Sequence, residues 1–183
     1  MTTTPRQNPE DRVMVFIDGS NLYHRLRNFH QRTDLDYAKF VEKLAGGRRL
    51  IRTYYYGAQL DQVRDPERYR NQQSFHNNLG RIPRFELRLG QLVYPPASNA
   101  VPYEKGVDVR LATDMLLHAA RGNCEVAILV SGDTDFVDMV QGVKDLGKNV
   151  EIALFDPRGS QALRRVADEV VEVDAPFLVD CWR

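Results

Sequence analysis

Short apolar runs alternate with amphipathic segments along this chain, and their lengths separate strands from helices. Residues 13–17 and 126–130 are continuous apolar runs, too short for a helix and typical of strands buried on both faces. Residues 85–93 alternate apolar and polar side chains, which predicts a strand with one face in water. Residues 107–121 carry apolar side chains at helical spacing, which predicts a helix.

The remaining segments continue this alternation. Further strands are expected over 49–57, 150–155 and 170–173, and further helices over 20–31, 37–44, 134–146 and 161–167 and from residue 66 onward. Ser20 and Asp36 are expected to cap their helices, and residues 95–102 to form a loop. Strands that alternate with helices predict an α/β fold, with a mainly parallel central sheet and helices on both faces.

Composition limits the classes of protein that fit. The 183 residues suffice for one domain, expected over 12–183, with residues 1–11 as a disordered lead-in. Lys+Arg and Asp+Glu are both 25, so a globally basic nucleic-acid binder is not indicated. Cys124 and Cys181 form no CxxC motif, which favours reduced thiols in a cytoplasmic protein. No apolar run approaches the roughly 20 residues of a membrane span, so no membrane partner is expected.

Acidic residues follow both apolar strands. Asp18 comes directly after residues 13–17, and Asp133 and Asp135 follow residues 126–130. Ligands of open parallel sheets bind beyond the carboxyl ends of the strands, where the strand order switches. Carboxylates gathered there repel one another unless a divalent cation binds between them. The pattern therefore predicts a Mg²⁺ or Mn²⁺ site.

The segment after the first strand, Asp-Gly-Ser-Asn, has other interpretations. It could be a turn with a serine cap. An aspartyl-phosphate phosphatase would need a second Asp where Ser20 stands, and an adhesion-type metal site would need a hydroxyl where Leu22 stands. Gly19 permits close approach to a ligand, and Asn21 adds a neutral oxygen ligand beside Asp18.

A third acidic source is the helix expected over 107–121. Asp108 lies at its start, where it could simply act as a cap. Asp114 lies six residues later, about 600° around a helix, so the two carboxylates do not share a face. Asp114 could face solvent, or it could be paired beside the apolar stripe.

Three segments together carry a family resemblance. They are FIDGSNLY at residues 16–23, KGVDVRLATDM at 105–115 and VSGDTDF at 130–136. In this order they resemble the NYN domain group of the PIN-like nuclease superfamily, in particular its LabA-like (DUF88) branch, over residues 13–173. The resemblance implies a PIN-like three-layer α/β sandwich and a metal-dependent ribonuclease that leaves 5′-phosphate and 3′-hydroxyl ends.

The resemblance also assigns roles to residues. It implies Asp18, Asp108 and Asp133 as the catalytic metal ligands, supported by Asn21, Ser131 and Asp135. Lys105 and Asp114 also fall within the family pattern. The motifs contain no Cys or His, so Mg²⁺ or Mn²⁺ suits them better than Zn²⁺.

An arginine-rich stretch is the candidate contact for single-stranded RNA. Arginines with interleaved aromatic residues could bind phosphates and stack on bases. The candidate contacts are Arg64, Arg68, Arg70, Arg81, Arg84 and Arg88, and the last three are the residues expected to bind substrate. The same stretch also fits a solvated charged face, because Asp61, Asp65 and Glu67 dilute its charge.

Two alternatives to a ribonuclease are left open. The acidic pocket could bind a nucleotide, an RNA or a protein without turnover, as a regulatory module, and a homo-oligomer is compatible with either function. A Toprim-like domain would explain the Asp133-Thr134-Asp135 triplet, but that fold requires a Glu where Asp18 stands.

Overall fold

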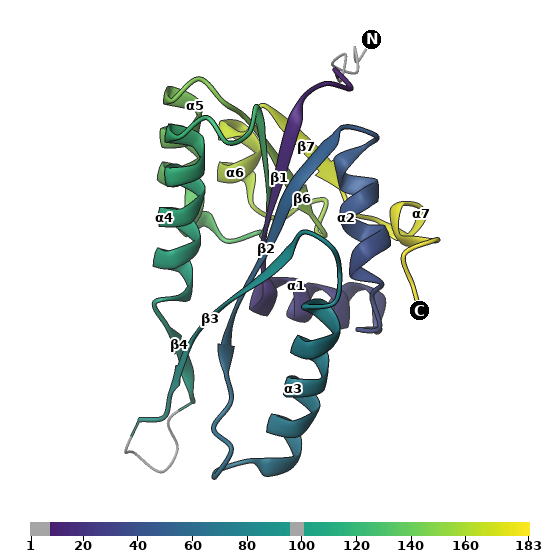
Figure 1. Ribbon diagram of the computed structural model, residues 1–183, viewed down its shortest axis with the longest axis vertical. Helices are drawn as coiled ribbons and strands as arrows, with labels where there is room; N and C mark the ends of the chain where they lie inside the picture. Colours follow the sequence, from purple (N-terminus) through teal and green to yellow (C-terminus); the bar gives the residue numbers. More distant parts are fainter. Residues whose placement is uncertain (1–7, 96–100) are drawn as a thin grey trace.

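A single mixed sheet forms the centre of the molecule (Figure 1). The computed structural model describes residues 8–95 and 101–183. Within them, the strands pair in the order β4-β3-β2-β1-β5-β6-β7. Every neighbouring pair is parallel except β3 and β4. The expected α/β class, with a mainly parallel sheet between helices, is confirmed.

The strand order places a switch point beside β1. The strands are β1 (Arg12–Asp18), β2 (Arg49–Gln59), β3 (Phe85–Val93), β4 (Tyr103–Lys105), β5 (Val126–Val130), β6 (Asn149–Leu154) and β7 (Glu169–Glu172). The chain leaves β1 toward β2 on one side and later returns as β5 on its other side. The loops that follow β1 and β5 therefore diverge, and a crevice forms between them, which is where such sheets bind ligands.

Helices cover both faces of the sheet. One side carries α1 (Gly19–Arg25), its π-helical continuation η1 (Leu26–His30), α2 (Tyr37–Ala45), α3 (Pro66–Leu79) and α7 (Ala175–Leu178). The other carries α4 (Val107–Ala120), the 3₁₀ turn η2 (Thr134–Phe136), α5 (Val137–Asp145) and α6 (Gln161–Val166). Figure 1 shows α4 and α5 on one side and α2 and α3 on the other.

The alternation of side chains along β1 explains this three-layer arrangement. Val15 and Ile17 pack in the core under α1 and α2, whereas Met14 and Phe16 pack in the core under α4 and α5. Because successive side chains of a strand point to opposite faces, an entirely apolar strand needs a helical layer on each side. The continuous apolar run therefore predicts the position of β1 correctly.

Several local expectations change in detail. The first helix begins at Gly19, and its cap is Asp18 rather than Ser20, because the Asp18 carboxylate accepts the Asn21 N–H. Asp36 caps α2 as expected, with Gly46 in the left-handed region at its end. Residues 96–100 of the expected loop and residues 1–7 of the expected lead-in lie outside the described residues.

Two composition-based expectations can be checked directly. Cys124 and Cys181 are free, as expected, and both are buried. None of the helices in residues 8–95 and 101–183 combines the length and the apolar character needed to cross a membrane.

Candidate functional site

The carboxylate of Asp18 lies at the carboxyl end of β1, at the switch point. Its side chain is buried, with 5% relative exposure. One oxygen accepts the Asn21 N–H at 3.0 Å and the other accepts the Ser131 hydroxyl at 2.9 Å. Burial raises the pKa of Asp18 above its ordinary 3.8, the two hydrogen bonds partly offset this, and the charges of Asp108 and Asp133 raise it further.

Gly19 is required directly after Asp18. A Cβ on Gly19 would lie 2.2 Å from Cζ of Tyr55, 2.4 Å from its Oη and 2.6 Å from the Tyr56 carbonyl oxygen. The chain therefore turns from β1 into α1 only because this residue has no side chain. The turn directs Asp18 toward the end of β5.

The loop after β5 interlocks with the loop after β1. Ser131 donates to Asp18, and its oxygen accepts the Asp133 N–H at 3.1 Å. The Gly132 N–H donates to Oδ1 of Asn21 at 3.1 Å. Asp133 in turn accepts the Asp135 N–H at 3.0 Å, which starts η2. Asn21 and Ser131 thus hold the two acidic loops together.

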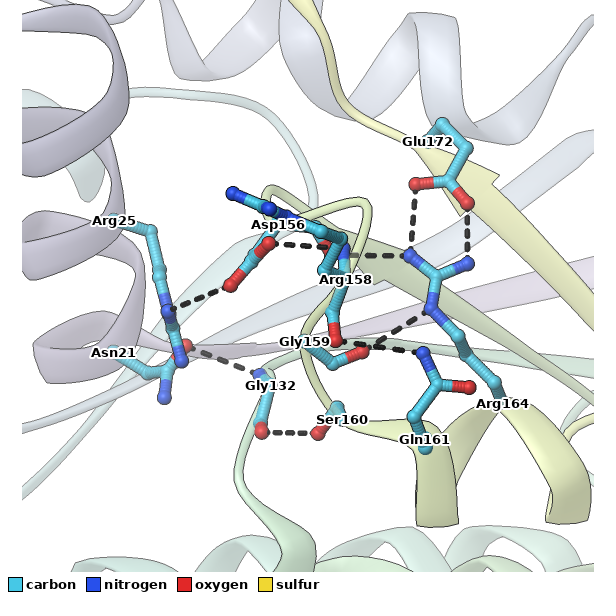
Figure 2. Close-up of polar contacts among 10 residues, drawn as sticks. All are labelled: Asn21, Arg25, Gly132, Asp156, Arg158, Gly159, Ser160, Gln161, Arg164 and Glu172. Carbon is cyan, nitrogen blue, oxygen red and sulfur yellow. Dashed lines mark hydrogen bonds and ion pairs between the residues drawn. The ribbon is translucent and has the colours of Figure 1, made fainter.

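A third loop, between β6 and α6, braces this arrangement (Figure 2). The Ser160 hydroxyl donates to the Gly132 carbonyl oxygen. Nη1 of Arg25 lies 3.9 Å from the Asp156 carboxylate, and Arg164 donates to the Asp156 carbonyl oxygen at 3.1 Å. Arg164 also pairs with Glu172 of β7, so the loop is anchored from both of its ends.

Asp108 enters from the first turn of α4. Gly106, at φ 76°, turns the chain from β4 into this helix, a conformation that favours glycine. The pKa of Asp108 is raised by partial burial, then by the charges of Asp133 and Asp135. The side chain of Asp108 is exposed, and its charge interacts with the charges of the loop after β5.

Glu104 is a further acidic residue that the sequence interpretation missed. It lies half-buried in β4. Its pKa is raised, chiefly by burial and then by the charge of Asp18, with a smaller contribution from Asp108. A backbone hydrogen bond from Ala58 partly offsets this rise. Its position directly before Lys105 and Gly106 was the available signal. We call Asp18, Glu104, Asp108, Asp133 and Asp135 the acidic cluster.

Two other candidates lie apart from these interactions. Lys105 ends β4 with an exposed side chain, next to the turn at Gly106. Asp114 accepts the Tyr56 hydroxyl at 3.0 Å and lies 3.6 Å from Nε of Arg88. The carboxylate of Asp114 is therefore engaged between α4 and the sheet.

The arginines expected to bind substrate are spread along the sheet. Arg81 and Arg84 lie in the turn before β3, at the amino-terminal edge, and Arg84 donates to the Leu50 carbonyl oxygen. That edge is opposite to the one that carries the acidic cluster. Arg88 lies within β3, pairs with Glu86 at 2.9 Å and stacks 5.0 Å from the Tyr54 ring centroid.

A pocket of about 970 Å³ opens beside the acidic cluster, between α1 and α3. Gly19 and Ser20 line it directly after Asp18, and Glu104 lines it from β4. Its aromatic lining includes Tyr23, Phe75 and Tyr94. The pocket and the acidic cluster are therefore contiguous, which the sequence pattern does not reveal.

The donor set of the acidic cluster suits a hard divalent ion. All its charged groups are carboxylates, the ligands that Mg²⁺ and Mn²⁺ prefer. Within the described residues, no three carboxylate, histidine or cysteine side chains are grouped closely enough to hold an ion by themselves. Mg²⁺ commonly binds through one or two carboxylates and keeps several waters, so the cluster fits such an ion without a closed cage.

Comparison with known families identifies this arrangement. The model of the NYN domain matches residues 12–174. The chain belongs to the NYN domain family. The NYN domain is nuclease-like, which supports a general ribonuclease-like function and RNA as the class of partner. NYN and PIN-like nucleases generally use divalent metal ions, in agreement with the oxygen-only donor set.

Individual relatives add information on the fold. The crystal structure of a protein of unknown function, VPA0982 from Vibrio parahaemolyticus, superposes with a TM-score of 0.73 at 24% identity. The match covers 94% of this NYN domain chain and 98% of the other. The uncharacterized protein MJ0482 of Methanocaldococcus jannaschii is 31% identical over 74 residues, which are 40% of this chain and 31% of that protein. The chain thus spans about a third of that curated relative.

Proposed function

We propose that this NYN domain is a metal-dependent endoribonuclease that cleaves phosphodiester bonds of single-stranded RNA with a metal-activated water. The observation that carries the proposal is the acidic cluster at the switch point. There the pKa values of Asp18, Glu104 and Asp108 are all raised, by burial and by neighbouring carboxylates. Binding of a cation among these carboxylates would offset their mutual repulsion and so stabilise the folded protein.

Asp18, Asp108 and Asp133 would hold Mg²⁺ or Mn²⁺, one or two of them directly and the others through water molecules of the ion. When bound, such an ion lowers the pKa of a water molecule and offsets the charge that develops on the phosphate oxygens. Asn21 and Ser131 would keep Asp18 oriented, because the Asn21 N–H and the Ser131 hydroxyl each donate to one of its carboxylate oxygens. The Asn21 side chain also holds the loop after β5 by accepting the Gly132 N–H. Asp135 and Glu104 would supply additional negative charge close to the ion.

The finer classification belongs to the same proposal. The three segments at residues 16–23, 105–115 and 130–136 lead us to assign the chain to the LabA-like branch. The two free cysteines lead us to place its action in the cytoplasm. Lys105 is proposed as a phosphate contact because it is exposed at the turn beside Asp108. Asp114 would act indirectly, by holding Arg88 and Tyr56 beside α4. Arg81, Arg84 and Arg88 would contact only RNA that extends along β3 and beyond the cleavage site.

A second candidate function is a binding module without turnover. Both oxygens of Asp18 already accept hydrogen bonds from the protein, which favours a rigid acidic pocket even without an ion. Such a module would bind a nucleotide, an RNA or a protein partner and leave it intact.

The experiment that separates these functions is a cleavage assay. End-labelled single-stranded RNA and DNA of the same sequence are incubated with the purified chain in Mg²⁺, in Mn²⁺ and in EDTA. The proposal predicts cleavage of RNA with either ion, 5′-phosphate product ends, and no cleavage in EDTA. Intact RNA under all three conditions would favour the binding module.

A further inference from the structure

The pocket between α1 and α3 has the composition of a site for an unpaired nucleobase. Tyr23 and Tyr94 are at its walls, and Phe75 lies deeper, packed against Tyr37 and Tyr55. Bases of single-stranded RNA stack on aromatic faces of this kind, without needing a particular sequence. At about 970 Å³ the volume is near the upper end of the roughly 300–1,000 Å³ typical of ligand pockets. It can therefore accept a nucleotide together with part of its neighbour.

The rim of this pocket carries the cations that a phosphate backbone requires. Arg64 and Arg68 line it, and their side chains are 60% and 73% exposed. Their ion pairs with Asp61 and Asp65, at 3.8 Å and 3.7 Å, are surface pairs within a few residues, which contribute little and exchange readily. The guanidinium of Arg64 also lies 4.5 Å from the Tyr94 ring centroid, so cation and aromatic face form one platform.

The position of the pocket relates it to the acidic cluster. Gly19 and Ser20 connect it to Asp18, and Glu104 belongs to both the pocket and the cluster. A strand with one phosphate at the acidic cluster would therefore present its next base to the pocket. Because the net charge of the whole chain is zero, we expect RNA binding to depend on local contacts of this kind.

We propose that the pocket between α1 and α3 binds one unpaired base of single-stranded RNA, next to the phosphate held at the acidic cluster. Tyr23 stacks on the base, and Arg64 and Arg68 contact the flanking phosphates. This inference rests on the proposed function for its substrate, but it concerns binding and not cleavage.

The test measures RNA affinity without turnover. Fluorescence anisotropy with an eight-nucleotide RNA is recorded in Mg²⁺, in the full chain carrying Asp18→Asn to slow cleavage, and gel analysis of the same samples checks that the RNA stays intact. Tyr23→Ala is compared with Phe29→Ala, because both side chains are 45% exposed on the same helical segment and Phe29 lies outside the pocket. Arg68→Ala is compared with Arg121→Ala, an exposed arginine at the end of α4.

We expect Tyr23→Ala to weaken binding about tenfold, the size of one lost base–aromatic stack, and Phe29→Ala to leave it unchanged. Arg68→Ala should weaken binding and reduce the salt dependence by about one phosphate contact, whereas Arg121→Ala should not. A series of RNAs with one abasic ribose at each position identifies the base concerned. At that position the abasic RNA should bind the parent and the Tyr23→Ala protein equally, because the stack is absent from both.

Two results would overturn the inference. The first is that Tyr23→Ala and Phe29→Ala change the RNA affinity of the Asp18→Asn protein, the parent of both variants, by the same amount. The other is the absence of measurable RNA binding by the parent protein. The cleavage assay is independent of this pocket, so metal-dependent cleavage together with an unaffected Tyr23→Ala protein would refute the pocket alone.

Discussion

At the scale of single residues, the ionisation of Asp18 connects stability with function. Its pKa is raised in the folded state, chiefly by burial, above the ordinary value of 3.8. A carboxyl group with a raised pKa stabilises the fold while it is protonated, below its ordinary pKa. That contribution is lost as the pH rises through the folded-state pKa. At neutral pH the metal-free protein therefore holds an unfavourable charge at the position where a cation would bind.

Asp18→Asn is expected to stabilise the metal-free protein at pH 7. The amide keeps the shape of the side chain but removes the buried charge, so the melting temperature should rise by roughly 2–4 °C, which is about 1 kcal/mol in a domain of this size. The difference should shrink as the pH falls toward 4, where the wild-type carboxyl becomes neutral. Thermal melts in EDTA at several pH values measure it, with Asp180→Asn as an exposed control. A destabilised Asp18→Asn protein at pH 7 would contradict this assignment.

Gly19→Ala is expected to be strongly destabilising. Its Cβ would meet the Tyr55 ring at 2.2 Å and the Tyr56 backbone at 2.6 Å, and backbone cannot move aside cheaply. A cost of about 1–3 kcal/mol is typical of such overpacking. Gly80→Ala is the matched control, because its Cβ would make only ordinary contacts, the nearest at 3.5 Å. Urea denaturation of both variants measures the difference. Equal free energies of unfolding would show that the turn after β1 can accommodate a Cβ, which would contradict this prediction.

Sequence reasoning finds the residues of the acidic cluster that directly follow central strands. Asp18 and Asp133 could be predicted because an apolar strand that ends in a carboxylate is a local pattern. Glu104 has its position before Lys105 as a local signal, but its role depends on β4 lying near the end of β2, which is a non-local contact. Asp114 lies in a segment that resembles the family, but the sequence does not indicate that its carboxylate accepts a hydrogen bond from the Tyr56 hydroxyl.

At the scale of elements, a buried ion pair fixes α2 to the sheet. Arg48 pairs with Glu151 of β6, with side chains 2% and 5% exposed, and it also donates to the Leu44 and Ala45 carbonyl oxygens at the end of α2. One Arg48–Glu151 contact measures 2.9 Å. The pair therefore connects a helix of one layer to a strand that lies two positions from β1 in the sheet.

Arg48→Met is expected to cost about 3–5 kcal/mol, because it leaves the Glu151 carboxylate buried without a partner. The double replacement Arg48→Met with Glu151→Gln should cost clearly less, since no uncompensated charge is left. Arg32→Met, which breaks an exposed pair with Asp34, serves as the control and should change stability little. Urea unfolding of the four proteins tests this. A double variant as unstable as the single one would mean that packing, and not charge, dominates at this position.

Elements differ in how well their sequence predicts them. The long helices and buried strands appear where periodicity places them, and α2 has both of its predicted end signals. The three-residue β4 has too few residues to show a pattern, and it exists only because it pairs antiparallel with β3. The change from α1 to π-helix at Leu26 also has no local signal in the sequence.

At the scale of the whole molecule, the acidic cluster should couple metal binding to folding. An ion that binds only the folded chain stabilises it by about 2.7 kcal/mol at one hundred times its dissociation constant. Millimolar Mg²⁺ or Mn²⁺ should therefore raise the melting temperature of the wild type, and EDTA should reverse the rise. Asp18→Asn should respond less, while Asp180→Asn should respond like the wild type. Equal melting temperatures with and without Mn²⁺ would argue against a metal site at this edge.

The most direct test of the proposed nuclease is the rate at which matched aspartate variants cleave single-stranded RNA with Mn²⁺. Asp18→Asn should lower that rate by roughly a hundredfold or more, because metal-held charge supplies several kcal/mol of transition-state stabilisation. Asp180→Asn, an exposed aspartate remote in sequence from the acidic cluster, should cleave at the wild-type rate. Equal rates for Asp18→Asn and the wild type, or no cleavage by nuclease-free wild-type protein, would contradict the proposed function.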